Sequence, residues 1–316
     1  MKNVDGNDRA VIAIIPSVRR HEWLHILRDA VRTKRGKIGL SLTLFVIGIA
    51  LIGPLVEPYN PETVGLGAPF FKPTSSSLLG GDVLGRDVLS RVLGGGYQLL
   101  ILAAAATAMG IFLGAALGII AAYFSGWRDG LIMRTVDVLL AFPQLVFALL
   151  LLSVLGNHLW LVVVAVGLTH APQVARVIRS TSLDVSERDF VKAVAITGVS
   201  PSKVMAREVA PNLISPLMVE VGLRMTYSII IMAGLAFLGF GFEPPNPTWG
   251  YMIRENQIGI STNSWGVIVP AILLAFLTIG FNTFTDAVAR VSLGVDRAER
   301  FEVTEMVDRI DTVGDN

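Results

Sequence analysis

Long apolar runs separated by short polar segments extend along the chain, and this pattern predicts helices that cross a membrane. The six runs cover about 38–56, 98–124, 131–155, 158–178, 216–240 and 267–289. An α-helix needs roughly 20 apolar residues to cross the hydrocarbon core, and each run is about that long. The sequence therefore predicts an all-α polytopic membrane protein with six transmembrane helices.

The polar segments divide the chain into regions. Residues 1–37 form a basic N-terminal segment ahead of the first helix at 38–56, and residues 57–97 form a loop rich in Pro, Gly and Ser. The other five helices make up a core at 98–291, and a charged tail follows at 292–316. The first run ends in GPLVEPYNP and not in the small residues of a cleavage site, so an uncleaved helix is favoured over a signal peptide.

The distribution of Lys and Arg predicts the orientation in the membrane. Only 16% of the residues are charged and 53% are hydrophobic, whereas a soluble domain has about a quarter of its residues charged. All but four of the 26 Lys and Arg residues fall on the side of the N-terminus, and the exceptions are Lys72, Arg86, Arg91 and Arg254. Because basic residues favour the cytoplasmic side, both termini are expected in the cytoplasm.

The residue types that carry chemistry argue against an enzyme. The chain has no cysteine, and its four histidines lack the spacing of metal ligands, so no metal site is expected. The apolar runs contain no visible catalytic set of the kind that an intramembrane enzyme needs, and the GxxxxGK[ST] phosphate loop of an ATPase is missing. A channel or secondary transporter is a further alternative, but the sequence contains no filter-like repeat.

Three glycines spaced by four residues, Gly110, Gly114 and Gly118, form a ridge in the second run. Such ridges let two helix backbones approach closely in lipid, where packing holds helices together. The ridge therefore predicts close packing with another helix, the alternative being that Gly and Ala are simply common in membrane helices. Pro143 lies inside the third run and is also assigned to helix packing.

Ionisable residues within the runs are few. Arg134 with Asp137, and Glu220 with Arg224, have the helical spacing at which opposite charges neutralise each other. Both pairs lie near predicted cytoplasmic ends, where long side chains can reach the aqueous phase. His170 is expected at a helix end. None of these residues is assigned to a substrate site.

A short amphipathic helix is predicted in the cytoplasmic segment at about 186–212. Ser186 and Asp189 fit a capping box, with Ser186 as N-cap and Asp189 at position N3. One stripe of the helix is apolar and consists of Phe190, Val191, Val194 and Ala195. Gly198 is expected to end the helix as a C′ residue.

A second short helix is predicted to begin with Pro201 at position N1 and to end at Pro211. The apolar stripe is too short for another span, so the two helices are expected to lie across the cytoplasmic face. The small residues Ala193 and Gly198 favour docking into a groove of a partner protein, and contact with lipid headgroups is the alternative.

This segment resembles the EAA loop of the membrane subunits of ABC importers. Lys192-Ala193-Val194 occupies the place of the EAA triplet, and Gly198 is the glycine that follows it. The version of the loop in peptide importers is nearer: Phe190–Gly198 and Arg207–Asn212 are similar to it, with Glu208 in place of a histidine.

Further blocks are similar to the C-type permeases of dipeptide, oligopeptide and nickel importers. Gly80–Gly96 (GGDVLGRDVLSRVLGGG) resembles the block before their second span, and Leu235–Ile253 resembles the block after their fifth. The stretch AFPQL at Ala141–Leu145 matches their third span. The blocks occur in the order of the family, and the resemblance covers about residues 35–298.

The resemblance implies a type I ABC importer permease fold and a subunit of the bacterial cytoplasmic (inner) membrane that translocates di- or oligopeptides. The partners it implies are a B-type permease in a heterodimer, two ATPase subunits that bind ATP and Mg²⁺, a periplasmic or lipid-anchored substrate-binding protein, and membrane lipid. No catalytic residue, cofactor or nucleic-acid partner is expected for this chain. Nickel complexes, opine-like compounds and oligosaccharides are alternative substrates, because related permeases import them.

The resemblance also assigns roles to residues. The helix that couples to the ATPase is expected to include Asp189, Phe190, Val191, Lys192, Ala193, Val194, Gly198 and Pro211. The outer-face motif is expected to include Asp82, Gly85, Arg86, Asp87, Arg91, Pro244, Pro245, Pro247, Trp249 and Gly250. Its charged residues are expected on an outer helix, either as a solvated cap of the bundle or as a docking face for the binding protein. The prolines predict a rigid turn, and Trp249 is expected at the membrane interface.

Overall fold

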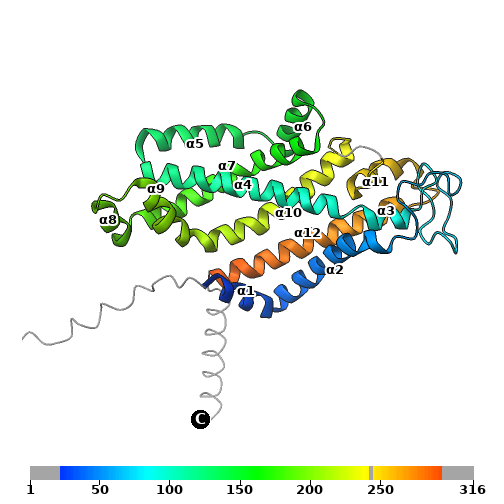
Figure 1. Ribbon diagram of the computed structural model, residues 1–316, viewed down its shortest axis with the longest axis horizontal. Coiled ribbons are helices and arrows are strands. Elements are labelled where there is room, and N and C mark those ends of the chain that lie inside the picture. The colour runs from blue at the N-terminus through cyan, green and yellow to red at the C-terminus, as the bar shows by residue number, and fades with distance from the viewer. Residues whose placement is uncertain (1–21, 242–244, 294–316) are drawn as a thin grey trace, which may run out of the picture.

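The computed structural model describes residues 22–241 and 245–293, and these residues form a bundle of helices (Figure 1). The α-helices are α1 (Glu22–Arg32), α2 (Lys34–Val56), α3 (Val88–Gly94), α4 (Tyr97–Phe124), α5 (Gly126–Leu140), α6 (Gln144–Leu155), α7 (Leu159–Ser186), α8 (Asp189–Ile196), α9 (Pro201–Val204), α10 (Ile214–Leu238), α11 (Trp249–Asn256) and α12 (Trp265–Ser292). A π-helical segment at Met205–Val209 and a 3₁₀ turn at Ala210–Leu213 join α9 to α10, and a second 3₁₀ turn at Gln257–Gly259 follows α11.

Five helical segments within the described residues are long and apolar enough to cross a membrane. They are Lys34–Val56, Val88–Phe124, Leu159–Ser186, Pro201–Leu238 and Trp265–Ser292. The bent pair of α5 and α6 makes a sixth span if its two helices are counted together. The prediction of an all-helical, polytopic protein is therefore confirmed, with its third span divided between two helices.

The break in this third span lies at Pro143, and α5 and α6 meet there at 90°. Proline has no backbone N–H, its ring clashes with the carbonyl four residues earlier, and it disfavours helical geometry in the residue before it. Pro143 is exposed and stands just before the first residue of α6. Pro143 was assigned to helix packing inside the third span, whereas it is exposed and lies between two helices.

The glycine ridge of α4 faces α7 along most of its length. A Cβ added at Gly110 would lie 2.7 Å from the Cβ of His170, and one at Gly114 would lie 2.6 Å from the carbonyl oxygen of Ala171. A Cβ at Gly118 would lie 2.7 Å from the carbonyl oxygen of Ala175. Real Cβ atoms do not approach other atoms this closely, so the separation of these two helices depends on the three glycines.

On the opposite side of the bundle, α2 and α12 lie side by side (Figure 1). A Cβ at Gly39 would lie 2.5 Å from the backbone nitrogen of Phe284, and one at Gly280 would lie 2.6 Å from the Thr43 hydroxyl oxygen. Small residues thus bring this pair together too. Between the two pairs runs α10, which contacts both α4 and α12.

The two ends of the bundle are different. One end carries α8 and α9, with α1 beside the final turns of α12, and the other end carries α3, α11 and the loop before α3 (Figure 1). The predicted cytoplasmic segment and the predicted outer-face motif therefore lie at opposite ends of the molecule.

Candidate functional site

At the α8 end, one face of α8 is anchored in the bundle. Val191 is only 2% exposed and belongs to a cluster of buried side chains, against which Val194 also packs. The other buried members of this cluster are Val174, Ile178, Val185, Val204, Val209 and Leu213. They come from α7 and from the segment that leads into α10, so α8 is packed against both helices.

On the other side of α8 and in the turn after it, exposed apolar side chains lie beside the exposed charged residues Asp189 and Lys192. Ile196 is 85% exposed, and Phe190, Ala193 and Val199 are exposed as well. An isolated exposed side chain needs no explanation, but here three apolar side chains lie on α8 and a fourth, Val199, lies three residues after its end. We refer to Phe190, Ala193, Ile196 and Val199 as the α8 face.

The local backbone of α8 differs from the prediction at its start and agrees at its end. Ser186 is the last residue of α7, and Arg188 takes the N-cap position without a side-chain capping bond. The predicted capping box is therefore wrong, because α7 continues for two turns beyond the predicted limit of its apolar run. Gly198 has a φ of 80°, the left-handed geometry typical of a C′ glycine.

The second short helix begins as predicted but does not end at Pro211. Pro201 occupies the first turn of α9, whereas Pro211 lies in a 3₁₀ turn that continues into α10. The backbone widens into a π-helical segment just before this proline, which accommodates its missing N–H. The side-chain amide of Asn212 donates to the Glu208 carbonyl oxygen at 2.6 Å. The segment that follows α8 is therefore continuous with a membrane span.

At the opposite end, four charged side chains form a closed cluster, which we call the outer ring: Asp82, Arg86, Arg91 and Glu255. The Asp82 carboxylate accepts from Arg86 Nε at 2.6 Å and lies 3.3 Å from Arg91 Nε. The Glu255 carboxylate accepts from Arg86 Nη2 at 2.9 Å and from Arg91 Nη2 at 2.7 Å. Two acids thus bridge two guanidinium groups, and the charges balance.

The outer ring is buried. Asp82, Arg86 and Arg91 are at most 2% exposed, and Glu255 is 11% exposed. The prediction of a solvated amphipathic helix is therefore wrong for these side chains. Since the four charged side chains are buried, a docking face on the loop before α3 would have to use exposed neighbours such as Leu84.

Short turns hold the ring in place. Asp87 caps α3 by accepting from the backbone N–H of Ser90 at 2.8 Å, and it also accepts from the Ser77 hydroxyl. Gly85 has a φ of 69°, and a Cβ there would lie 2.2 Å from the carbonyl oxygen of Gly67. The spacing of the motif thus serves a tight turn and a cap, in addition to the ion pairs.

Trp249, at the start of α11, is fully buried, and its indole N–H donates to the Val92 carbonyl oxygen at 2.9 Å. Trp249 was expected at the membrane interface, and its side chain packs inside the protein. Gly250 packs α11 on α10, because a Cβ there would lie 2.4 Å from the Ala233 carbonyl oxygen. Pro245 is exposed and Pro247 half-buried. The remaining motif residue, Pro244, lies outside the described residues.

Sequence analysis did not find Glu255, which closes the ring from more than 160 residues away. It also missed Asn263, whose side-chain amide donates to the carbonyl oxygens of Leu79 and Gly81 at 3.0 and 2.9 Å. Neither contact has a local spacing signal.

Burial, and then the nearby Glu255 carboxylate, raise the pKa of the Tyr251 phenol on the neighbouring turn of α11.

A second polar group lies inside the bundle, between α4, α7 and α10. The Ser228 hydroxyl lies 2.9 Å from His170 Nε2 and 2.9 Å from the Thr107 hydroxyl. His170 is fully buried in the middle of α7, so its expected place at a helix end is wrong. Its Nδ1 atom has no hydrogen-bond partner among the described residues.

Beside this group, Arg224 donates to Glu220 at 3.0 Å and also to the side chain of Gln173. The predicted pairing of Glu220 and Arg224 is therefore confirmed. Both side chains are buried, so they do not reach the aqueous phase as expected. The other predicted pair does not form, because Asp137 pairs with Arg176 of α7.

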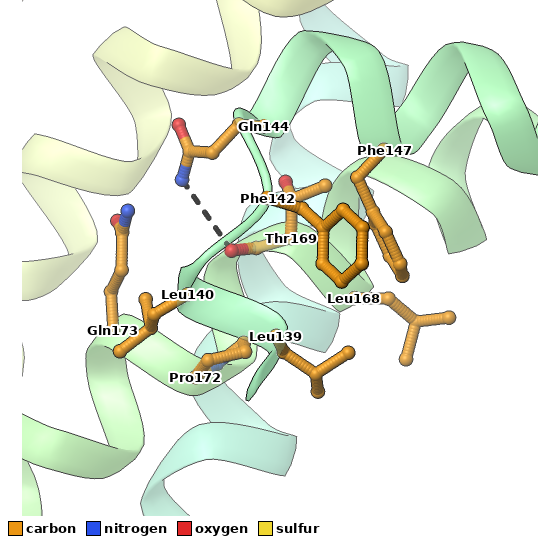
Figure 2. A pocket seen from close by; sticks show the side chains of 9 residues that line it. All are labelled: Leu139, Leu140, Phe142, Gln144, Phe147, Leu168, Thr169, Pro172 and Gln173. Atoms are coloured by element: carbon orange, nitrogen blue, oxygen red, sulfur yellow. Dashed lines mark hydrogen bonds between the residues drawn. The ribbon is translucent and has the colours of Figure 1, made fainter. Parts of the chain in front are cut away.

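Gln173 also lines a small hollow at the bend between α5 and α6 (Figure 2). On the other side of the hollow, the Gln144 side-chain amide donates to the Thr169 carbonyl oxygen at 3.4 Å, as the dashed line in Figure 2 shows. The remaining lining is mostly apolar: Leu139, Leu140, Phe142, Phe147, Leu168 and Pro172. The bend is thus tied to α7 by a polar contact.

The structure thus has a short helix anchored at one end of a bundle of membrane-length helices and a loop held by buried ion pairs at the other. Residues 114–292 match the family described as binding-protein-dependent transport system inner membrane component. This match covers more than half of the chain, which therefore belongs to that family.

The chain is also similar to individual permeases over most of its length. It is 31% identical to the glutathione transport system permease protein GsiD of Shigella boydii serotype 4, covering 90% of this chain and 96% of the relative. It is 30% identical to a putative peptide transport system permease protein of Brucella suis biovar 1, covering 88% and 93%. It is 28% identical to the dipeptide transport system permease protein DppC of Alkalihalophilus pseudofirmus, covering 84% and 87%.

The fold matches a solved structure of the MetNI methionine ABC transporter in an inward-facing conformation. The TM-score is 0.51 at 16% identity, and the match covers 64% of this chain and 96% of the other. The predicted type I ABC importer permease fold is confirmed. The chain is a multi-pass membrane permease.

Proposed function

We propose that this permease is one of two membrane subunits of an ATP-driven importer of di- or oligopeptides. The observation that supports this most directly is the α8 face, a set of exposed apolar side chains beside Asp189 and Lys192 on a helix anchored in the bundle. On this proposal, the α8 face seats in a cleft of an ATPase subunit on the cytoplasmic side, and that partner binds ATP and Mg²⁺.

The packing around α8 gives a route for coupling. Val191 and Val194 pack against residues of α7 and of the segment leading into α10. Close-packed interiors transmit displacement because they have few voids to absorb it. Motion of the ATPase would therefore shift α7 and α10 together, and these helices carry His170, Ser228 and Arg224 inside the bundle.

At the other end, a substrate-binding protein would deliver the peptide, and the buried outer ring would keep the loop before α3 in one shape for that contact. Relatives named for dipeptide, peptide and glutathione transport support the peptide class. The heterodimeric partner is a B-type permease on this proposal. Both termini and α8 face the cytoplasm, which agrees with the distribution of Lys and Arg.

The test is the ATPase activity of the reconstituted complex, with and without binding protein loaded with a di- or tripeptide. Ala193→Glu places a charge on the α8 face, and Ser180→Glu, on an exposed position of α7, is the matched control. We expect the stimulation by peptide to disappear in Ala193→Glu and to persist in Ser180→Glu, with both chains assembled in the membrane.

Two results would contradict parts of the proposal. If the wild-type complex responds only to a binding protein loaded with another ligand, such as a nickel complex or an oligosaccharide, the peptide assignment fails and the importer remains. If Ala193→Glu behaves as the control does, α8 is not the coupling element.

A further inference from the structure

The elbow between α1 and α2 presents a row of basic side chains for which the proposed function has no role. Residues 22–37 contain five basic and two acidic residues. The five basic side chains, which we call the basic elbow, are all exposed: Arg28, Arg32, Lys34, Arg35 and Lys37. None of them forms an ion pair with another described residue.

Helix α1 is held against the bundle by its opposite face. Ala30 is fully buried against Ala287 and Val288 of α12, and Ile26 and Leu27 pack around the same cluster. At 3.6 residues per turn, Arg28 and Arg32 fall on the side of α1 opposite Leu27 and Ala30. These two guanidinium groups therefore point away from the bundle.

The turn between the helices is tightly defined. The Thr33 hydroxyl donates to the Ala30 carbonyl oxygen at 2.7 Å, and the Thr33 hydroxyl oxygen accepts from the backbone N–H of Gly36 at 2.9 Å. A Cβ at Gly36 would lie 1.9 Å from the Ala30 carbonyl oxygen, so only glycine fits there. The basic side chains on both helices are thus presented from a fixed backbone.

The elbow lies where α2 enters the membrane. The exposed apolar side chains of α2 begin at Ile38, directly after Lys37, and continue with Leu44 and Phe45. The basic elbow is therefore continuous with a lipid-facing surface. Clusters of Lys and Arg immediately on the cytoplasmic side of a membrane span attract anionic headgroups.

We propose that the basic elbow binds the headgroups of anionic phospholipids and thereby holds α1 at the membrane surface. A lipid fits better than a second protein, because the charged and the apolar surfaces meet at Lys37 and Ile38 as headgroup and acyl chain do. The α1 cluster also includes Met218 and Val219 of α10. The bound headgroups would therefore fix the surface against which the cytoplasmic end of α10 packs.

The proposal is tested on the complete complex purified in detergent, and lipid binding does not depend on the peptide assignment. Native mass spectrometry counts the phosphatidylglycerol molecules retained, with phosphatidylcholine as the neutral probe. Removing one charge weakens such binding about fivefold, so Arg28→Gln with Arg32→Gln is expected to weaken it about 30-fold. Arg128→Gln with Arg134→Gln removes the same charge from exposed positions of α5 and is the matched control.

We expect the wild type and the control to retain phosphatidylglycerol in preference to phosphatidylcholine, with a preference that falls as salt is raised. Arg28→Lys with Arg32→Lys should keep the preference, which separates charge from folding. The proposal is overturned if the wild type shows no preference, or if the Gln pair and the control lose it equally. Loss of an ATPase subunit from the Gln pair, with its lipid count unchanged, would assign the elbow to a protein partner.

Discussion

Substituting Glu255→Ala in the outer ring is expected to destabilise the protein strongly. The ring holds two acids and two bases, so removing Glu255 leaves Arg86 and Arg91 with only Asp82 between them. Both guanidinium groups remain buried, at 2% and 0% exposed. Breaking a buried pair by removing one partner costs about 3–5 kcal/mol, because an uncompensated charge stays in the interior.

The assay is the thermal unfolding midpoint of the purified protein in detergent, followed by the loss of its monodisperse gel-filtration peak. At about 2–4 °C per kcal/mol, the midpoint should fall by about 6–20 °C. Glu62→Ala removes an exposed acid from the loop between α2 and α3 and should leave the midpoint unchanged. A midpoint for Glu255→Ala within about 2 °C of wild type would refute the argument, because the ring would then be solvated.

A double variant separates charge balance from lost packing. Glu255→Ala with Arg86→Leu removes one acid and one base, which leaves Asp82 and Arg91 as a neutral pair. Replacing a buried pair by apolar side chains is often close to neutral. We expect the double variant to unfold at a higher temperature than Glu255→Ala alone. If it unfolds at a lower temperature, packing of the Arg86 side chain contributes more than its charge.

Two further predictions concern the interior of the bundle and use the same unfolding assay. Gly114→Ala should destabilise the α4–α7 contact by about 1–3 kcal/mol through overpacking. The control Gly48→Ala has open space around it and should be neutral or stabilising by up to about 1 kcal/mol. Equal effects of the two substitutions would exclude close packing as the reason for the glycine ridge. Ser228→Ala leaves His170 and Thr107 without this partner and should cost about 1–3 kcal/mol, whereas Ser180→Ala on the exposed face of α7 should not change the midpoint.

The sequence predicted the spans well because hydropathy along the chain is a local property. The predicted starts of the second, fifth and sixth spans lie within two residues of the starts of α4, α10 and α12. The limits were poorer where polar residues continue a helix inside the protein. The run around His170 looks like a helix end by composition, but α7 continues to Ser186 because one of its faces stays buried as far as Ser182 and Val185.

The outer-face motif illustrates what local spacing cannot predict. Asp82 and Arg86 are four residues apart and do pair, although on a turn and not on a helix. The partner that closes the ring, Glu255, lies on α11 and is brought there by packing of Trp249 and Gly250. Motif spacing thus predicted a charge cluster, whereas its burial and its fourth member depend on tertiary contacts.

The predicted coupling segment has a different continuity in the structure. Pro211 reads as a helix end, since proline breaks an interior helix. The chain instead passes it with one π-helical segment and one 3₁₀ turn, and the Asn212 amide binds the Glu208 carbonyl oxygen. Such irregular turns recur at functional positions in helices. Their hydrogen bonds are not encoded in any periodic pattern of the sequence.

On the proposed function, this continuity makes α10 a mechanical link between the two ends. At one end it is continuous with the segment that packs against Val191 of α8. At the other end Gly250 seats α11, which carries Glu255 of the outer ring, directly on its backbone. A displacement of α8 on the proposed function would therefore reach the ring through one rigid helix. It follows that Glu255→Ala and Ala193→Glu should impair transport in different ways. The first should loosen the outer end, and the second should uncouple the ATPase from an otherwise intact bundle.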